Sequence, residues 1–512
     1  MRLVMENIME FVEQVAEKLG GSERIKSMKT LQQIGYGQYA YMWGGGNISA
    51  STEAPLKYMA ANDLQRNWNF QENTFQMKER RNMLFPFASE FGHAFFPNNL
   101  ILDENIAYDI LPDGKMNRVA EFMQTPLMAD GRRIRKLWSL TNPVVVIHKL
   151  LNHNITILKV NDLNNKVEIE LSTESGDKII FTIDKDTCIP QSVKWNTAQT
   201  NLGEIEFTTT FTGYMSFDEV HLPMGYSTKM DFRDTVYFKI YVDGYKVNEE
   251  LDSLKAPEQI VTTEVPAEFL PPLEVEKIDE NVWRIGGIGG TTVIEFENHF
   301  TLFELYWSQI QAKAIIEKAN TLVPGKKVTE LIISHYHFDH TGGFRAAVAA
   351  GLRIYANREN EIILRELAER ETPDFDDVIT SEVNRQFEFV PVDEHVRLSD
   401  HMTTLDIYRV VSNNHMADAV FGYLPQKKIF MDSDIATPAY DWQLWPDSYL
   451  DNIAKYKLDV EKVTTVHEKV MTHKEVLEFI EGGKYRAKER GRKYEEMNEY
   501  LPGYPVFRTR ND

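Results

Sequence analysis

The stretch LIISHYHFDHTGG, residues 331–343, holds three histidines and one aspartate directly after an apolar run that is typical of a buried strand. Because side chains alternate along an extended chain, His335 and His337 point to the same side. Asp339 and His340 follow where the chain turns towards a helix. Imidazole nitrogens and carboxylate oxygens are the usual ligands of zinc and similar divalent ions. The stretch therefore predicts a metal site at a strand-to-helix junction.

The alternative interpretation of this stretch is a polar strand end whose histidines only make hydrogen bonds, and the dense spacing disfavours it. The order of the residues resembles the His-x-His-x-Asp-His signature of the metallo-β-lactamase superfamily. That resemblance covers roughly residues 272–485. It implies a four-layer αββα sandwich with metals at the sheet edge, and further ligands downstream.

Three later segments match the places where the superfamily carries those ligands. His415 follows the apolar residues 410–411 and a short polar loop. Asp434 lies in IFMDSDI, residues 429–435, where Asp432 is the alternative and the apolar residue after Asp434 favours Asp434. His467 follows the strand-like run VTTV, and its rival His473 is expected at the surface, near the start of a helix.

The resemblance implies a binuclear centre with seven protein ligands. It assigns His335, His337 and His415 to one metal, Asp339, His340 and His467 to the other, and Asp434 to a bridge between them, shared with a water or hydroxide. Two divalent ions are expected, with zinc first and iron or manganese as alternatives. Glu304, at the end of a predicted strand, is a candidate to hold a ligand histidine, although a surface or capping role is equally compatible.

The implied activity is hydrolysis of an ester, lactone or thioester by the metal-bridging hydroxide, because two cations lower the pKa of a shared water from about 15.7 towards ~7. Asp434 and Asp339 are the predicted catalytic residues, with Asp339 carrying a proton to the leaving group. A sulfate- or phosphate-ester hydrolase with the same ligands is an alternative, although neither Arg345 nor Arg353 is clearly placed to bind an anion. A lipid- or acyl-binding carrier with a vestigial metal site is another.

Differences between this signature and those of individual subfamilies reduce the number of subfamilies that the chain resembles. Oxygen-reducing di-iron relatives have a glutamate where this chain has His337. The lone Cys188 lies far from the signature, which excludes lactamase subclasses with a cysteine ligand. The remaining ligand set resembles glyoxalase II and the lactonases. RNase Z, with the same pattern, is disfavoured because a net charge of −21 repels phosphate backbones.

Periodicity divides the chain into four parts. An amphipathic helix is expected within residues 1–27, followed by an antiparallel β-rich domain over residues 28–256, whose short alternating strands weakly resemble lipoprotein-carrier sheets. A proline-rich linker is expected over residues 257–272. Alternating strands and helices over residues 273–512 predict an α/β catalytic domain, so the fold class is α+β followed by α/β.

The composition limits which binding partners and which cellular locations we expect. No apolar run approaches the ~20 residues of a membrane span, and the single cysteine excludes an intramolecular disulfide. We expect a small-molecule substrate, no nucleic acid, no integral membrane segment, and compatibility with a homo-oligomer. A cytoplasmic location is expected, or a periplasmic one if a signal peptide precedes this sequence.

Overall fold

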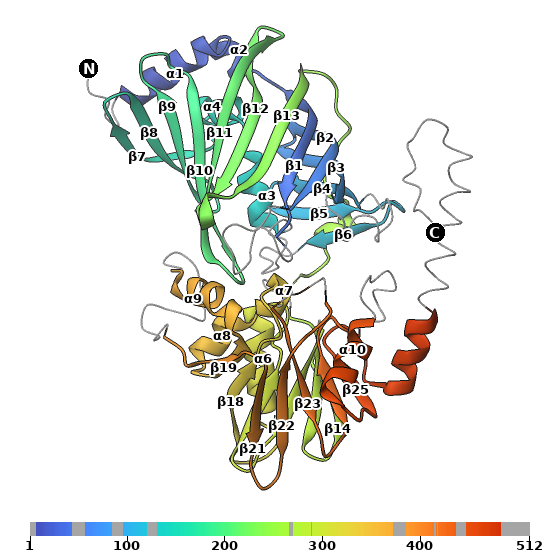
Figure 1. Cartoon of the computed structure of the whole chain (residues 1–512). Helices are drawn as coiled ribbons and strands as arrows, with labels where there is room; N and C mark the ends of the chain where they lie inside the picture. Colours follow the sequence, from blue (N-terminus) through green and yellow to red (C-terminus); the bar gives the residue numbers. More distant parts are fainter. Residues whose placement is uncertain are drawn as a thin grey trace, which may run out of the picture. The chain divides into compact units, whose positions relative to one another are not determined.

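The computed structural model describes residues 7–42, 57–83, 96–119, 131–265, 270–287, 289–371, 386–413, 416, 418–436 and 447–482. The chain forms two compact units (Figure 1). Unit 1 contains Met1–Phe269 together with Arg370–Thr380, and unit 2 contains Leu270–Glu369 together with Ser381–Asp512.

Unit 1 is built on a large antiparallel sheet, in which thirteen strands of the described chain pair in the order β6-β5-β4-β3-β2-β1-β13-β12-β11-β10-β9-β8-β7 (Figure 1). Its strands are β1 (Thr30–Ala40), β2 (Tyr58–Asn69), β3 (Thr74–Met83), β4 (Phe96–Asp103), β5 (Ile106–Ile110), β6 (Met116–Val119), β7 (Thr156–Asp162), β8 (Lys166–Ser172), β9 (Lys178–Asp184), β10 (Pro190–Gln199), β11 (Gly203–Phe217), β12 (Val220–Met230) and β13 (Val236–Val247). The expected large antiparallel sheet is therefore present.

Alternation along the strands explains which face of this sheet is covered. In β8 every second side chain is buried, as expected for a strand with one face on a core. The α-helices that precede β7 in this unit are α1 (Ile8–Lys18), α2 (Ser22–Lys26), α3 (Arg132–Ser139) and α4 (Pro143–Leu151). Trp138 of α3 packs on Trp195 of β10 and Phe207 of β11, so α3 covers part of the apolar face of the sheet.

Helix α4 begins with a capping residue followed by a proline. Asn142 accepts hydrogen bonds from the backbone N–H groups of Val144 and Val145, and Pro143 occupies the first turn. Both features satisfy or remove N–H groups that have no partner inside a helix. The expected N-terminal helix is α1, followed by a glycine turn and α2.

The proline-rich segment differs from a plain linker, because it contains the short helix α5 (Glu258–Val261). Pro257 is extended at the residue that precedes the helix, where a proline is tolerated. Ile260 of α5 is buried against Ile101 and Tyr108 of the sheet. This segment is thus partly anchored to unit 1.

Unit 2 contains two sheets. Over the described residues of this unit, the first sheet has seven strands: β14 (Glu274–Asp279), β15 (Val282–Gly287), β16 (Gly289–Glu295), β17 (His299–Phe303), β18 (Lys327–Ile332), β19 (Arg353–Asn357) and β20 (Phe389–Val392). Over the same described residues, the second sheet has six strands: β21 (His395–Ser399), β22 (Thr404–Arg409), β23 (Val420–Leu424), β24 (Ile429–Asp432), β25 (Lys462–Thr465) and β26 (Met471–Thr472). Strands β17 to β20 run parallel, because α6 (Gln309–Ala319), α8 (Phe344–Ala349) and α9 (Glu361–Glu369) return the chain between them.

The core of unit 2 lies between the two sheets, where Ile294, Phe303 and Ile332 meet Ile407 and Met431. Helix α6 packs on the outer face of the first sheet. Helix α10 (Asp447–Tyr456) covers the second sheet, with Tyr449 of the helix against Phe430 of β24 (Figure 1). The order helices, sheet, sheet, helices confirms the expected αββα sandwich. No described helix has the length and apolar character needed to cross a membrane.

Candidate metal centre

The signature residues lie where β18 ends and the short helix α7 (Phe338–Thr341) begins. The chain stays extended up to His337, which precedes α7, and then turns. The imidazole rings of His335 and His337 have centroids 4.3 Å apart, as the alternation along an extended chain predicts. His335, His337, Asp339 and His340 are all buried. Four ligand-type side chains are therefore concentrated at one sheet edge.

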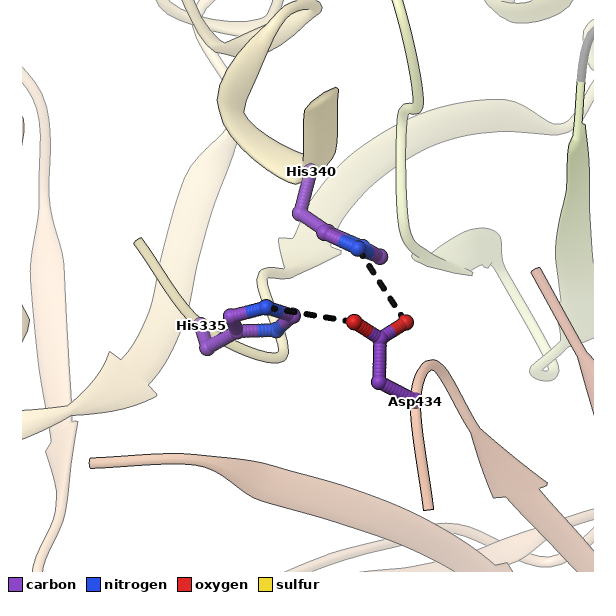
Figure 2. Close-up of side chains that lie close together, drawn as sticks. All are labelled: His335, His340 and Asp434. Carbon is purple, nitrogen blue, oxygen red and sulfur yellow. Dashed lines mark ion pairs between the residues drawn. The ribbon is translucent and has the colours of Figure 1, made fainter. Parts of the chain in front are cut away.

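Asp434 lies at the centre of this cluster. Figure 2 shows His335 and His340 directed at its carboxylate. The carboxylate lies 3.7 Å from Nε2 of His335, 3.3 Å from Nε2 of His340 and 2.8 Å from Nε2 of His467. Since these residues follow β18, β24 and β25, the sandwich brings three separate chain segments to one carboxylate.

A second group shares His340 with the first. The ligand atoms of Asp339, His340 and His467 lie within 4.8 Å of one another, as do those of His335, His340 and Asp434. His473 belongs to neither group. It is half-buried, and its Nδ1 atom lies 2.8 Å from the hydroxyl of Tyr449. Of the two candidate histidines after β25, His467 therefore lies in a metal-binding group and His473 does not.

One predicted ligand cannot be placed. His415 lies outside the described residues, and its predicted role stays a prediction. His337 is buried beside His335, although it belongs to neither compact group. The other nitrogen of His335, Nδ1, lies 2.8 Å from the hydroxyl of Ser334 and 3.5 Å from that of Ser433. These hydroxyls, which the sequence pattern did not single out, fix the orientation of the ring.

The structure also decides between the two aspartates after β24. Asp432 accepts the backbone N–H groups of Ile435 and Ala436, so it closes the turn that carries Asp434. Burial raises the pKa of Asp432 to about 7, and the nearby carboxylate of Asp434 adds to this rise. Asp434 is the aspartate whose carboxylate faces the histidines, and its role as a bridge between two metals stays a prediction.

Glu304 is fully buried at the end of β17, which rules out the surface alternative. One of its oxygens accepts the backbone N–H of Ser334 at 2.6 Å, and the other lies 3.2 Å from Nδ1 of His340. With Nδ1 of His340 beside this carboxylate, Nε2 on the other side of the ring faces the cluster. Glu304 therefore sets the orientation of His340.

The charge of the cluster calls for a cation. Burial by itself disfavours the charged form of His340, but Asp434, Asp339 and Glu304 outweigh it and hold the pKa of His340 well above its ordinary value. Nε2 of this buried ring faces two carboxylates, those of Asp434 at 3.3 Å and Asp339 at 3.5 Å. Imidazole and carboxylate together are the donor set of divalent zinc, iron or manganese. The residues present therefore fit a metal site.

Sequence reasoning missed Tyr306. Its hydroxyl donates to Oδ2 of Asp339 at 3.2 Å, and its ring meets the rings of His340 and His467 edge to face. The only sequence signal is its place two residues after Glu304. An aromatic residue after a strand is ordinary, so the contact could not have been found from the pattern.

The sequence profile of the metallo-beta-lactamase superfamily matches residues 287–399. A comparison with curated proteins gives no match.

Solved structures similar to the chain include two metallo-beta-lactamases. The one from Pontibacter korlensis has 16% identity and a TM-score of 0.31, and the match covers 40% of this chain and 95% of that one. The one from Hirschia baltica has 15% identity and a TM-score of 0.31, and the match covers 41% of this chain and 96% of that one. The inverting sec-alkylsulfatase from a Pseudomonas species has 16% identity and a TM-score of 0.32, with 45% of this chain and 44% of that one covered. Similarities at this level carry no argument about the substrate.

Proposed function

The C-terminal unit is a metallo-β-lactamase superfamily domain, the domain of a metal-dependent hydrolase, and from this premise we propose a binuclear enzyme that cleaves an ester, lactone or thioester. One observation carries the proposal. The carboxylate of Asp434 lies within 3.7 Å of three buried histidine nitrogens from other chain segments. A carboxylate with two oxygens in this position is suited to be shared by two cations.

The seven predicted ligands divide into two metal positions. Asp339, His340 and His467 would hold one cation, His335, His337 and His415 the other, and Asp434 would contact both. When bound, two divalent cations supply Lewis acidity and make a shared water acidic enough to provide a nucleophile at neutral pH.

The chain's own residues prepare the site. Glu304 holds His340 with Nε2 towards the cluster, and Tyr306 holds one oxygen of Asp339. Asp339 would carry the proton to the leaving oxygen or sulfur, since its carboxylate lies in the group with His340 and His467. Burial of these side chains keeps competing water away and strengthens their electrostatic interactions.

The alternative substrates are less well supported. A sulfate or phosphate ester calls for a cationic side chain beside the metals. Arg345 is buried and donates to the carbonyl of Leu367, and Arg353 pairs with Glu330 and Glu388. The ion pairs of Arg353 are therefore with these two glutamates. A carrier with a vestigial site would be expected to have lost ligands, whereas the six described candidates keep imidazole or carboxylate groups there.

The experiment that tests this proposal measures metal per chain by plasma mass spectrometry, on protein purified without added metal. The expected result is about two zinc, iron or manganese ions in the parent and fewer in Asp434→Ala. Asp432→Asn is the matched control, because it changes the neighbouring buried carboxylate that closes a turn. It should keep its metal and lose stability.

A substrate screen completes the test. Lactones, thioesters, carboxylic esters and sulfate esters would be assayed with the metal-loaded parent, and activity on one of the first three classes that Asp434→Ala lacks supports the proposal. A parent that holds no metal even after reconstitution contradicts the hydrolase. Activity on sulfate esters alone contradicts the proposed substrate class and leaves the metal centre in place.

A further inference from the structure

Tyr306 contacts every member of one metal-binding group. Its hydroxyl lies 3.2 Å from Oδ2 of Asp339. Its ring stands nearly perpendicular to the imidazole of His467, with centroids 5.1 Å apart, and edge-on to that of His340, with centroids 5.3 Å apart. The side chain is buried. One residue thus borders the carboxylate and both rings that would hold the same cation.

The surrounding chain holds Tyr306 in place. Its carbonyl accepts a hydrogen bond from Nε2 of Gln311 in α6 at 3.0 Å. The next residue, Trp307, donates its backbone N–H to the carbonyl of Asp339 at 2.7 Å and has a φ of 81°, a conformation that only surrounding contacts can maintain. Gly289 lies against the ring, where a Cβ atom would approach Cδ1 to 2.5 Å.

A tyrosine that only fills the core needs no such contact, because a phenylalanine would bury the same ring. The hydroxyl in contact with Asp339 restricts the rotation of a short carboxylate whose oxygens would otherwise exchange places. Groups that hold metal ligands typically change metal affinity by about 10–100-fold when they are removed. The placement of this hydroxyl therefore predicts an effect on the metal and not only on the fold.

We propose that Tyr306 is a positioning residue, which orients Asp339 so that Asp339, His340 and His467 form a prepared site for one of the two cations. The inference rests on the proposed binuclear function. Tyr306 acts through Asp339, so the other metal position, around His335, should not depend on it.

The test compares Tyr306→Phe with Tyr355→Phe in the full chain. Tyr355 is a matched control, because its buried hydroxyl also donates to a carboxylate, Glu330, away from the cluster. Metal would be removed with a chelator, and zinc affinity measured by competition with a chelating dye. We expect one of two zinc sites to weaken by about 10–100-fold in Tyr306→Phe, and neither site to change in Tyr355→Phe.

Two further measurements separate positioning from a general loss of structure. Cobalt(II) absorption should change in Tyr306→Phe and stay the same in Tyr355→Phe, because it reports the ligand geometry. In an Asp339→Ala background, Tyr306→Phe should have no additional effect on affinity, since a residue acting through Asp339 has nothing left to orient.

Each outcome has one meaning. Unchanged affinity and spectrum in Tyr306→Phe, with two zinc ions in the parent, overturn the role of Tyr306 and leave the binuclear site intact. An additive loss in the double variant shows a structural effect and also overturns it. A parent without zinc contradicts the proposed function itself.

Discussion

Glu304 shows how a single residue can serve two partners in the cluster. It has a φ of 68°, which is uncommon for a residue other than glycine, and it is fully buried. Its two oxygens face the backbone N–H of Ser334 and the ring of His340. Such strain persists only where the surroundings enforce it, and here it aims a carboxylate at a candidate ligand.

We predict that Glu304→Gln keeps the fold but weakens metal binding by about 10–100-fold, because an amide can no longer hold the donating Nδ1 of His340 as strongly. Glu304→Ala should also cost about 1–3 kcal/mol in the free energy of unfolding, since the buried N–H of Ser334 loses its acceptor. Zinc competition and urea unfolding measure the two effects. Parental affinity in both variants would show that Glu304 has no part in orienting His340.

At the scale of elements, the loop between β17 and α6 depends on two glycines at the end of the signature. A Cβ atom at Gly342 would lie 2.2 Å from the carbonyl oxygen of Trp307, and one at Gly343 would lie 2.5 Å from that of Leu305. Gly343 also donates its N–H to Leu305 at 3.0 Å. The turn into α8 and the loop with Glu304 are therefore packed backbone against backbone.

We predict that Gly343→Ala destabilises unit 2 by about 1–3 kcal/mol and weakens metal binding, because the added methyl group must displace backbone. Gly422→Ala is the control. Its Cβ atom would meet the end of the Met431 side chain at 2.8 Å, which can move aside. Thermal unfolding and zinc competition compare the two variants, and equal effects from both would argue against the backbone contact as the cause.

For the whole molecule, the buried titratable groups of the two units lie in different surroundings. Unit 2 concentrates carboxylates and imidazoles in the candidate metal centre. Unit 1 buries His148 in α4, where its ring stacks on that of Phe70 at a centroid distance of 4.0 Å. Burial, followed by the neighbouring charge of Lys149, lowers the pKa of His148 to about 4. Unit 1 should therefore respond to a change of pH, and unit 2 to the removal of metal.

We predict that acidification from about pH 6.5 to pH 4 destabilises unit 1, because the unfolded chain binds a proton at His148 that the folded unit binds only near pH 4. The loss per pH unit is at most about 1.4 kcal/mol for one proton, and His148→Gln should reduce it. A chelator should destabilise unit 2 instead, through loss of the bound metal. Hydrogen exchange followed peptide by peptide assigns each effect, and a chelator effect confined to unit 1 contradicts the prediction.

The sequence predicts those parts of the fold that depend on local patterns, namely individual strands and helices. Alternation in segments such as residues 167–172, and helical spacing after Ser308, arise from neighbours along the chain, and the structure has β8 and α6 there. The signature at residues 335–340 likewise predicted a dense cluster, because its side chains are brought together by one turn of backbone. The structure places these histidines in the buried cluster.

Only the tertiary structure decided which distant residues join that cluster. Asp432 and Asp434 differ little in sequence context, and packing of the second sheet turns one towards backbone N–H groups and the other towards the histidines. Glu304 and Tyr306 depend on a loop whose backbone is held by contacts with the signature glycines. Periodicity reports burial and direction along one segment, whereas contacts between segments depend on how sheets and loops pack in three dimensions.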